Sequence, residues 1–501
     1  AATYGSDAIG GVINFLTRKD FKGLQLNLSH QEIDDSDGNQ DFGAIFGTEL
    51  GGMDWVTSIG YETRNELSMR DRDFTTRPYS ENPQGGYSSI GNPGVYFLPA
   101  EAGSTFGALP GLSANGTADP NCENLGGVRN SLFCRFRYTD FDNLIEEEER
   151  YQIFSELNGE FDSGVGMHLE VMYSKVDVPV WKTSPSYPPQ ALFGDIQQLP
   201  ADHPGLVAFA DKYPDFQKYT TVQTDDNGDP IAGTGEGAVF YGRIAGVAGY
   251  LDTGKGRAAE RSYDTYRIAG TLDGDFDNGV GWDIGLSVSK AESVLAGVDA
   301  RIGRTKLAFR GFGGDSCAAS LDTEGNLITN GAVAGQNGCE YYNPLSNAIQ
   351  TSYSESTYGY QNPDYDPSVA NSLSVLRYLD DTANTRSESL LTVFDAVFQG
   401  DLFGGSAAWA AGYQYRKISL ETQIDDLNNV AVNPCKFEGQ TTCSARTGLR
   451  SFLASGKEVD ADQDVHSVFF ESALDINEDL DLQLAVRYED YGDQSTFDPK
   501  L

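Results

Sequence analysis

Apolar and polar residues alternate along many segments of the chain. The stretch 282–289 has an apolar residue at every second position: Trp282, Ile284, Leu286 and Val288. Successive side chains of a strand point to opposite faces, so this pattern predicts strands with one apolar and one polar face. The segments 55–61, 151–161 and 480–488 repeat the pattern.

About eleven strands of this kind are expected. Their ranges are 24–31, 40–49, 54–66, 149–161, 167–177, 261–276, 282–294, 387–402, 407–421, 464–476 and 480–491. Most exceed the usual length of about 5–6 residues. A soluble β-sandwich or propeller also has strands with one apolar face, but its strands are shorter and its turns more even.

The connections between these strands alternate between short and long. Short turns are expected near Gly51-Gly52, Asp162-Ser163-Gly164, Asp277-Asn278-Gly279, Phe403-Gly404-Gly405 and Asn477-Glu478-Asp479, where Gly, Asn and Asp tolerate positive φ. Long polar loops are expected near 68–147, 179–258, 298–385 and 423–461. This asymmetry is typical of outer-membrane barrels. The predicted fold is all-β: a transmembrane antiparallel β-barrel with long extracellular loops.

The predicted strand count indicates an incomplete barrel. Bacterial barrels close with an even number of strands, and an odd count leaves the last strand with an unpaired edge. Unpaired N–H and C=O groups are unfavourable in lipid. We therefore expect these strands to form part of a larger barrel.

Composition narrows the class of protein further. The chain has 35 Lys+Arg against 74 Asp+Glu, a formal net charge of −39, which argues against nucleic-acid partners and polybasic membrane binding. The charge suits a protein that faces the cell exterior, although solubility alone also explains it. No apolar run approaches the about 18 residues of a spanning helix. The start at Ala1-Ala2-Thr3 has no signal-peptide pattern, which fits a mature or a truncated N-terminus equally.

Six cysteines fall into three local pairs, all on the predicted long loops: Cys122 and Cys134, Cys317 and Cys339, Cys435 and Cys443. The even count and short spacings favour disulfides and an oxidising compartment. A metal site is not expected, because there is no C-x-x-C and the four histidines do not cluster near the cysteines.

Three acidic clusters have the alternating oxygen ligands that suit calcium: Asp35-x-Asp37-x-Asn39, Asp225-x-Asn227-x-Asp229 and Asp322-x-Glu324-x-Asn326. None completes an EF-hand, and tight Asp/Asn/Gly turns are the favoured interpretation. No cofactor is predicted. The sequence contains neither a P-loop nor H-E-x-x-H, and its Ser, His and Asp residues are scattered, so we do not expect an enzyme.

The stretch from Thr3 to Arg18 resembles the end of the plug domain in TonB-dependent outer-membrane receptors. The matching positions are Tyr4, Gly5, Ala8, Gly10, Gly11, Val12, Ile13 and Asn14. The small residues permit tight backbone packing, and the apolar ones form a short buried strand. An ordinary glycine bend is the alternative. Two further passages resemble parts of these receptors. Leu307–Gly314 with Cys317, followed by Cys339–Pro344, resembles a long loop, and Arg487–Gly492 followed by Phe497–Lys500 resembles a mid-barrel hairpin, where the returning strand starts.

The resemblance implies two parts, the end of a plug at 1–20 and the N-terminal half of a barrel at 21–501. It also implies active uptake of a scarce, bulky ligand across the bacterial outer membrane: a siderophore, cobalamin, an oligosaccharide or a peptide. The expected partners are outer-membrane lipid, the TonB energy-coupling complex and a small to medium extracellular ligand. The TonB box and most of the plug have no counterpart in this sequence, so no coupling residue is assigned.

Two alternatives stay open: a passive porin or surface-binding adhesin, and a secreted β-rich enzyme acting on polysaccharide. If the protein is a receptor, loop aromatics are the candidate ligand contacts: Trp181, Tyr187, Phe193, Tyr241, Phe309, Phe312, Tyr341 and Tyr342. Aromatic faces stack on sugars or planar chelates, with polar neighbours supplying hydrogen bonds. The alternative role for each is packing one loop against another.

Overall fold

The structure is a computed structural model of the chain. It describes residues 16–500 except 84–85, 92, 100–104, 107–108, 111, 138, 140–141, 184–193, 232–233, 245–256, 352–360, 403–406, 445–446, 451–455 and 478–479. No helix within these ranges is long and apolar enough to cross a membrane.

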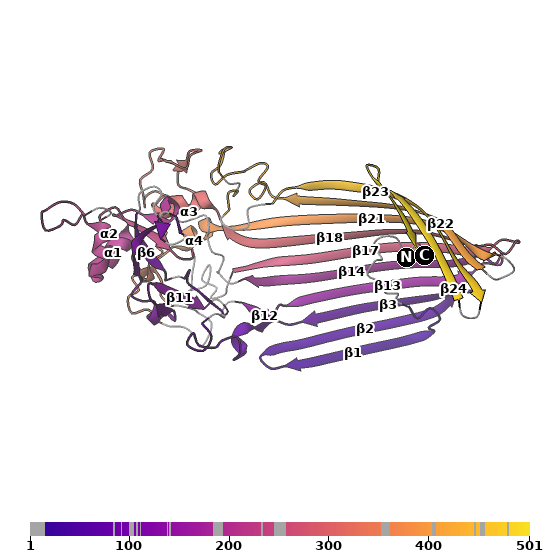
Figure 1. Cartoon of the computed structure of the whole chain (residues 1–501). Coiled ribbons are helices and arrows are strands. Elements are labelled where there is room, and N and C mark those ends of the chain that lie inside the picture. Colours follow the sequence, from indigo (N-terminus) through magenta and orange to yellow (C-terminus); the bar gives the residue numbers. More distant parts are fainter. Residues whose placement is uncertain are drawn as a thin grey trace.

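One twelve-stranded sheet dominates the molecule (Figure 1). In spatial order its strands are β1 (Gly23–Ile33), β2 (Ser36–Leu50), β3 (Met53–Arg64), β13 (Glu148–Glu160), β14 (Gly166–Thr183), β17 (Arg257–Asp275), β18 (Gly281–Ala300), β21 (Asp380–Leu402), β22 (Ala407–Ile424), β23 (Val459–Asn477), β24 (Leu480–Asp490) and β25 (Ser495–Lys500). All neighbours are antiparallel, and the spatial order follows the chain order. The molecule is therefore mostly β.

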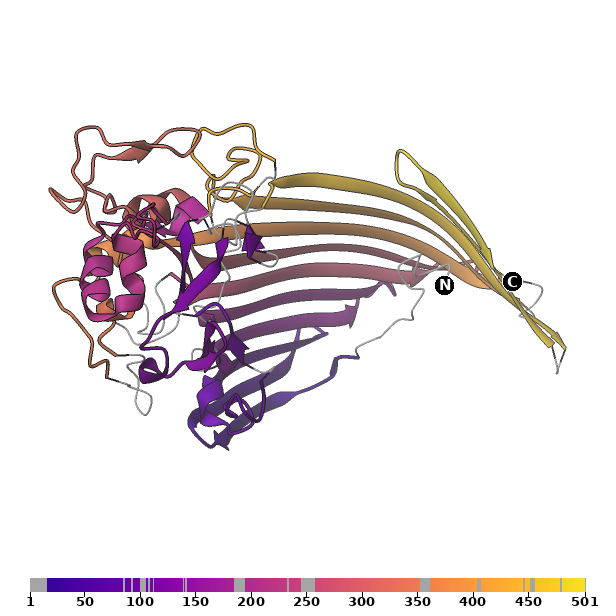
Figure 2. The ribbon, with the colours of Figure 1, turned by 60° about the vertical axis from the view of Figure 1, so that its left-hand side comes forward.

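The eleven predicted strands are all present, but the predicted count is wrong by one. The twelfth strand, β25, pairs with β24, so the segment 480–490 has a partner on both sides. The alternation of apolar and polar residues does not show β25, because the strand is six residues long and contains Pro499, but the resemblance of this passage to a mid-barrel hairpin implied a returning strand here. Within the described residues, β1 and β25 each pair with one neighbour only, and the curved sheet stays open between them (Figure 2).

Tight turns join the strands at one end of the sheet. Gly51 and Gly52 connect β2 and β3 with φ of 61° and 84°, and Gly164 and Gly279 have φ of 81° and 79° in the next two turns. These positive values are the reason for glycine at the positions that the sequence marked as turns. The turn at 403–405 and most of that at 477–479 lie outside the described residues.

The other end of the sheet carries the long loops, which contain short helices and strands (Figure 1). The helices are α1 (Pro204–Lys212), α2 (Gln217–Thr220), α3 (Ile302–Phe309) and α4 (Leu373–Leu379). The loop strands are β4 (Leu67–Ser68), β5 (Tyr87–Ser88), β6 (Val95–Pro99), β7 (Thr105–Phe106), β8 (Leu109–Pro110), β9 (Leu112–Ala118), β10 (Val128–Asn130), β11 (Phe133–Arg137), β12 (Asn143–Ile145), β15 (Gln198–Leu199), β16 (Ala238–Tyr241), β19 (Ser320–Leu321) and β20 (Leu327–Ile328). The sequence predicted long loops here but none of these helices.

Three of the four loops share one hydrophobic core. Its buried members include Tyr96 from the first loop, Phe209 from the second and Phe309 from the third. The rings of Tyr96 and Phe240 lie 5.5 Å apart, and those of Phe240 and Phe309 lie 6.2 Å apart. Packing of this kind gives long connections a fixed shape that they would lack individually.

A buried arginine attaches the fourth loop to the sheet. Arg450, only 2% exposed, donates from Nε to Asp381 Oδ2 at 3.0 Å and from Nη1 to Asp425 Oδ1 at 2.8 Å. Its Nη2 donates to the Thr382 carbonyl at 2.8 Å. Both ends of the loop are therefore fixed against the start of β21.

Replacing Arg450 by Met is expected to destabilise the fourth loop by about 3 kcal/mol, because two carboxylates lose their buried partner. Hydrogen exchange of the amides in 425–450 measures this local opening. Arg386→Met is the control, since Arg386 is half-exposed in its 2.6 Å pair with Glu292 and should change stability by less than about 1 kcal/mol. Equal hydrogen-exchange protection in the two variants would contradict the conclusion that Arg450 fixes the fourth loop.

Candidate functional site

The apolar face of the sheet is exposed. On β18 the apolar run extends from Trp282 to Val288, and Leu286 near its middle is 53% exposed. Cross-strand partners continue the face, since Leu286 lies opposite Gly270 and Phe394, and Ile284 opposite Leu272. The six residue steps of this run span roughly 20 Å. The run ends at Lys290, whose Nζ lies 2.9 Å from Glu388 Oε2.

Aromatic rings border the apolar face at both ends. Toward the loops, the rings pair as Tyr61 with Tyr151 and Tyr173 with Tyr266, each at 4.9 Å. Toward the tight turns, they pair as Phe46 with Trp55 at 5.9 Å and Phe276 with Trp282 at 6.4 Å. Amphipathic rings at the two edges of an apolar band are typical of an interface between lipid and water.

The opposite face of the sheet is polar and carries ion pairs. Arg267 Nε lies 2.7 Å from Glu170 Oε1, and Arg487 Nε lies 3.0 Å from Glu489 Oε1 with both side chains almost fully buried. On the same face, Thr17 donates a 2.9 Å hydrogen bond to the buried Glu156. The segment before β1 therefore contacts the polar face.

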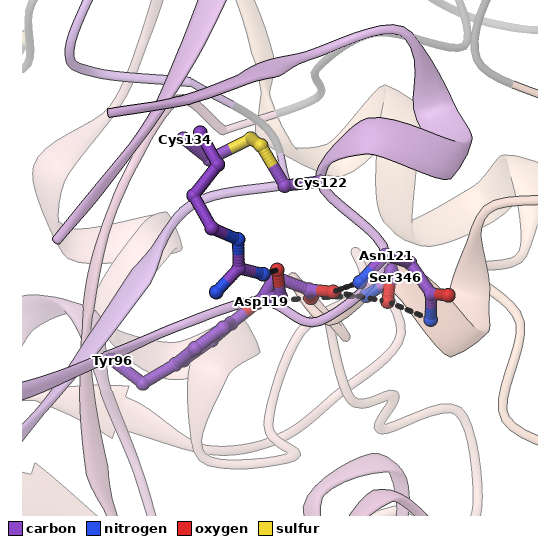
Figure 3. Close-up of a disulfide and its surroundings, with 7 residues drawn as sticks. Tyr96, Asp119, Asn121, Cys122, Cys134 and Ser346 are labelled. Carbon is purple, nitrogen blue, oxygen red and sulfur yellow. Dashed lines mark hydrogen bonds between the residues drawn. A yellow bond between two sulfur atoms is a disulfide. The ribbon is translucent and has the colours of Figure 1, made fainter. Parts of the chain in front are cut away.

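A buried carboxylate joins the first loop to the third (Figure 3). Asp119 accepts hydrogen bonds from the Ser346 hydroxyl at 2.6 Å, the Ser346 N–H at 3.1 Å and the Asn121 N–H at 2.9 Å. Tyr96 adds a bond from its hydroxyl to the Pro344 carbonyl at 3.0 Å. Burial raises the pKa of Asp119 to about 6, although its hydrogen bonds oppose this shift.

A buried histidine joins the second loop to the same part of the third. His203 precedes α1, where its Nδ1 accepts from the Leu206 N–H at 3.4 Å, and its Nε2 lies 3.2 Å from the Tyr342 carbonyl oxygen. Burial lowers the pKa of His203 to about 4. The central segment, Tyr342–Asn347, is thus held by Asp119 on one side and His203 on the other.

The structure places six of the eight candidate aromatic residues. Tyr241, Phe309, Phe312 and Tyr342 are buried in loop cores, the packing role that the sequence left open. Tyr341 is partly exposed, with its ring 4.8 Å from that of His203. Trp181 is also partly exposed and lies beneath the Arg261 guanidinium at 3.5 Å. Tyr187 and Phe193, like the plug motif at 4–14, lie outside the described residues; ligand contact by any of the eight stays a prediction.

The three cysteine pairs expected from spacing are bonded: Cys122–Cys134, Cys317–Cys339 and Cys435–Cys443. Each bond closes a local ring of loop residues. The first bond lies beside Asp119 and Asn121, as Figure 3 shows. These rings restrict the loops independently of the shared core.

Two of the acidic clusters form tight turns. The Oδ1 of Asp225 accepts from the N–H groups of Asn227 and Asp229, and Asp322 makes the same bonds to Glu324 and Asn326. The backbone bonds lower the pKa of Asp225, and a 2.9 Å bond from the Asn326 side-chain amide, together with the backbone bonds, lowers that of Asp322. In the described part of the chain, no three His, Cys, Asp or Glu side chains are close enough to hold a metal ion.

The described part of the loops borders at least two cavities. One, of about 550 Å³, lies between the first and second loops and is bordered by Arg129, Tyr213 and Lys218. The other, of about 280 Å³, lies between the third and fourth loops and is bordered by Arg301, Arg304 and Lys436. No sequence motif marks these residues, although basic residues are scarce in a chain with 35 Lys+Arg against 74 Asp+Glu.

Comparison with known proteins gives structural likenesses only, since no family model and no curated protein matches the chain. The structure is similar to a mutant of the ferric enterobactin receptor PfeA from Pseudomonas aeruginosa in complex with enterobactin, with 10% identity, a TM-score of 0.42, and coverage of 100% of this chain and 44% of that chain. For the siderophore receptor PirA from Acinetobacter baumannii the values are 13%, 0.41, 100% and 43%.

A third likeness is to the RagAB peptide transporter, with 8% identity, a TM-score of 0.33, and coverage of 92% of this chain and 33% of that chain. The chain therefore spans less than half the length of the structures that it matches.

The two buried groups predict opposing pH effects on the loop assembly. Because the pKa of Asp119 is higher in the folded loops, its protonated form stabilises them. This stabilisation is complete below its ordinary pKa of 3.8 and is lost as pH rises through about 6. His203 favours them above its ordinary pKa of 6.5, and this contribution is lost as pH falls through about 4. Each effect amounts to about 3 kcal/mol. Loop stability should therefore change little between these limits in the unmodified protein.

Single substitutions should separate the two effects. Asp119→Asn should leave a protein whose loops lose stability on acidification, whereas His203→Asn should leave one whose loops gain it. Hydrogen exchange of loop amides between pH 4 and 6.5, corrected for the intrinsic rate, measures both slopes. If loop stability changed with pH in the same direction in both variants, the opposing effects of Asp119 and His203 would be refuted.

Proposed function

We propose that the protein takes up a scarce, bulky ligand across the bacterial outer membrane, with energy supplied through TonB. The observation that carries the proposal is the exposed apolar face of the long antiparallel sheet, bordered by aromatic rings at both ends. Exposed apolar area on this scale is unfavourable in water and favourable in lipid. The roughly 20 Å run on β18 is close to the about 25 Å apolar band of outer-membrane barrels.

The arrangement of the connections also supports placement of the sheet in the outer membrane, with the long loops outside the cell. Outer-membrane barrels have short turns on the periplasmic side and long loops outside. The disulfides, the shared loop core and both cavities lie at the long-loop end, where a ligand would arrive. The ligand-binding region is therefore assigned to these loops, with Trp181 and Tyr341 as the candidate aromatics that keep exposed surface.

The N-terminal motif distinguishes energised uptake from a passive pore or an adhesin. Residues 1–20 resemble the end of a plug, a segment that a porin lacks. The hydrogen bond from Thr17 to Glu156 supports this interpretation, because it brings the residues after the motif against the polar face of the sheet. We assign 21–501 to the barrel and its loops.

A charge on the apolar face tests the membrane placement. Leu286→Arg in the full-length protein should lower the free energy of unfolding in lipid vesicles by about 2–4 kcal/mol. Ser287→Arg, one residue along on the polar face, should have a much smaller effect. Guanidinium titration followed by tryptophan fluorescence measures both. Equal losses in the two variants would argue against contact between this face and lipid.

Uptake itself tests the energised mechanism. Cells that express the full-length protein should accumulate its ligand, and deletion of tonB should reduce accumulation to the level of cells without the protein while surface binding persists. A radiolabelled extract of growth medium, fractionated for compounds that these cells deplete, supplies the ligand. Accumulation that survives the deletion would refute energised uptake and favour a passive pore.

A further inference from the structure

The cavity between the third and fourth loops reverses the charge balance of the chain. Its lining contains Arg301, Arg304 and Lys436 but one acidic residue, Glu438. The whole chain has 35 basic against 74 acidic residues. Three cations around one small cavity in such a chain provide a local site for an anion.

One face of α3 forms the basic wall. Arg304 follows Arg301 by one helical turn, and Leu307 follows by another. Arg304 Nη1 donates to the Tyr378 carbonyl at 3.1 Å, and its guanidinium lies 5.0 Å from the centroid of the Tyr378 ring. These contacts hold the guanidinium in one place, while its weak 3.7 Å pair is with Asp315, which is 78% exposed.

Two segments, each closed by a disulfide, form a further part of the lining. The ring closed by Cys317–Cys339 contains Leu321, and the ring closed by Cys435–Cys443 contains Phe437. Phe437 packs directly over Gly325, where a Cβ would come within 2.2 Å of the aromatic ring. The two disulfide-closed segments therefore contact each other, and they contribute the apolar Leu321 and Phe437 as well as Lys436 and Glu438 to the lining.

A carboxylate of the chain itself already occupies the mouth of this site. Glu438 Oε1 accepts from Arg301 Nη2 at 2.5 Å, yet the Glu438 side chain is 73% exposed. Arg301 is 17% exposed and its Nε also lies 4.0 Å from Asp381 Oδ2, so only Glu438 is on the solvent side of the pair. An incoming anion can therefore replace the exposed Glu438 carboxylate while Arg301 stays in place. The contact also indicates that Arg301 accommodates a carboxylate at this point.

We propose that this cavity binds the carboxylate end of an apolar or aromatic ligand, which displaces Glu438 from Arg301. Arg304 supplies a second set of donors, and Leu307, Tyr378 and Phe437 contact the ligand body. The volume of about 280 Å³ suits one end of a larger ligand or a small aromatic acid. The inference rests on the proposed uptake function and names the ligand class that the site would take.

Binding to the purified full-length protein in detergent tests the proposal without any energy source. The probes are N-acetylphenylalanine and its neutral amide, measured by calorimetry. The acid should bind at least tenfold more tightly than the amide. Arg304→Gln should reduce this preference several-fold, because only Arg301 then binds the carboxylate. Glu438→Gln should strengthen binding of the acid several-fold, because the competing carboxylate is gone. Arg386→Gln, on β21 outside the cavity, is the control and should bind like the unmodified protein.

Glu438→Gln keeps the proposal testable if Arg304→Gln fails to fold, because the exposed Glu438 side chain can be changed without disturbing packing. Equal binding of acid and amide, no binding of the acid, or weaker binding by Glu438→Gln would each overturn the proposal. The two hypotheses fail separately: carboxylate-selective binding with uptake independent of TonB would reject only the uptake mechanism. TonB-dependent uptake without carboxylate-selective binding would reject only this site.

Discussion

The ladder of backbone hydrogen bonds between long antiparallel strands is the constraint on which the other features depend. A strand with an exposed apolar face gains little from side-chain burial, so its N–H and C=O groups need partners within the sheet. Register is fixed along the ladder, since Leu286 lies opposite Gly270 on one side and Phe394 on the other. A shift by one residue would exchange the apolar and polar faces of a strand.

The strands also determine where the loops can assemble. Because β14, β17, β18 and β21 extend beyond the apolar band, the loops begin well away from it and near one another. The central segment, Tyr342–Asn347, then contacts the first loop through Asp119 and the second through His203. Arg450 fixes the fourth loop separately, by ion pairs to the start of β21 and to Asp425. The loops thus form one structured end of the molecule.

Electrostatics differ between the parts of this acidic chain. The loop core contains a carboxylate and an imidazole whose shifted pKa values both reflect burial, and they stabilise the loops in opposite pH ranges. The cavity beside α3 concentrates cations, partly compensated by Glu438. In the acidic clusters at 225–229 and 322–326, the first aspartate accepts backbone hydrogen bonds within a tight turn. Local surroundings, more than net charge, decide what each group can do.

The sequence by itself determined the eleven long strands, the three turns that the structure describes and the cysteine pairs, because these features depend on residues close together along the chain. A strand with alternating apolar and polar residues can be recognised without knowing its partner strand, and Gly51 indicates a turn from the local sequence alone. Only the tertiary structure decided that Phe309 and Tyr342 are buried and that Arg304 and Phe437 border one cavity. Those contacts join residues far apart in sequence, and loop composition carries no period that would predict them.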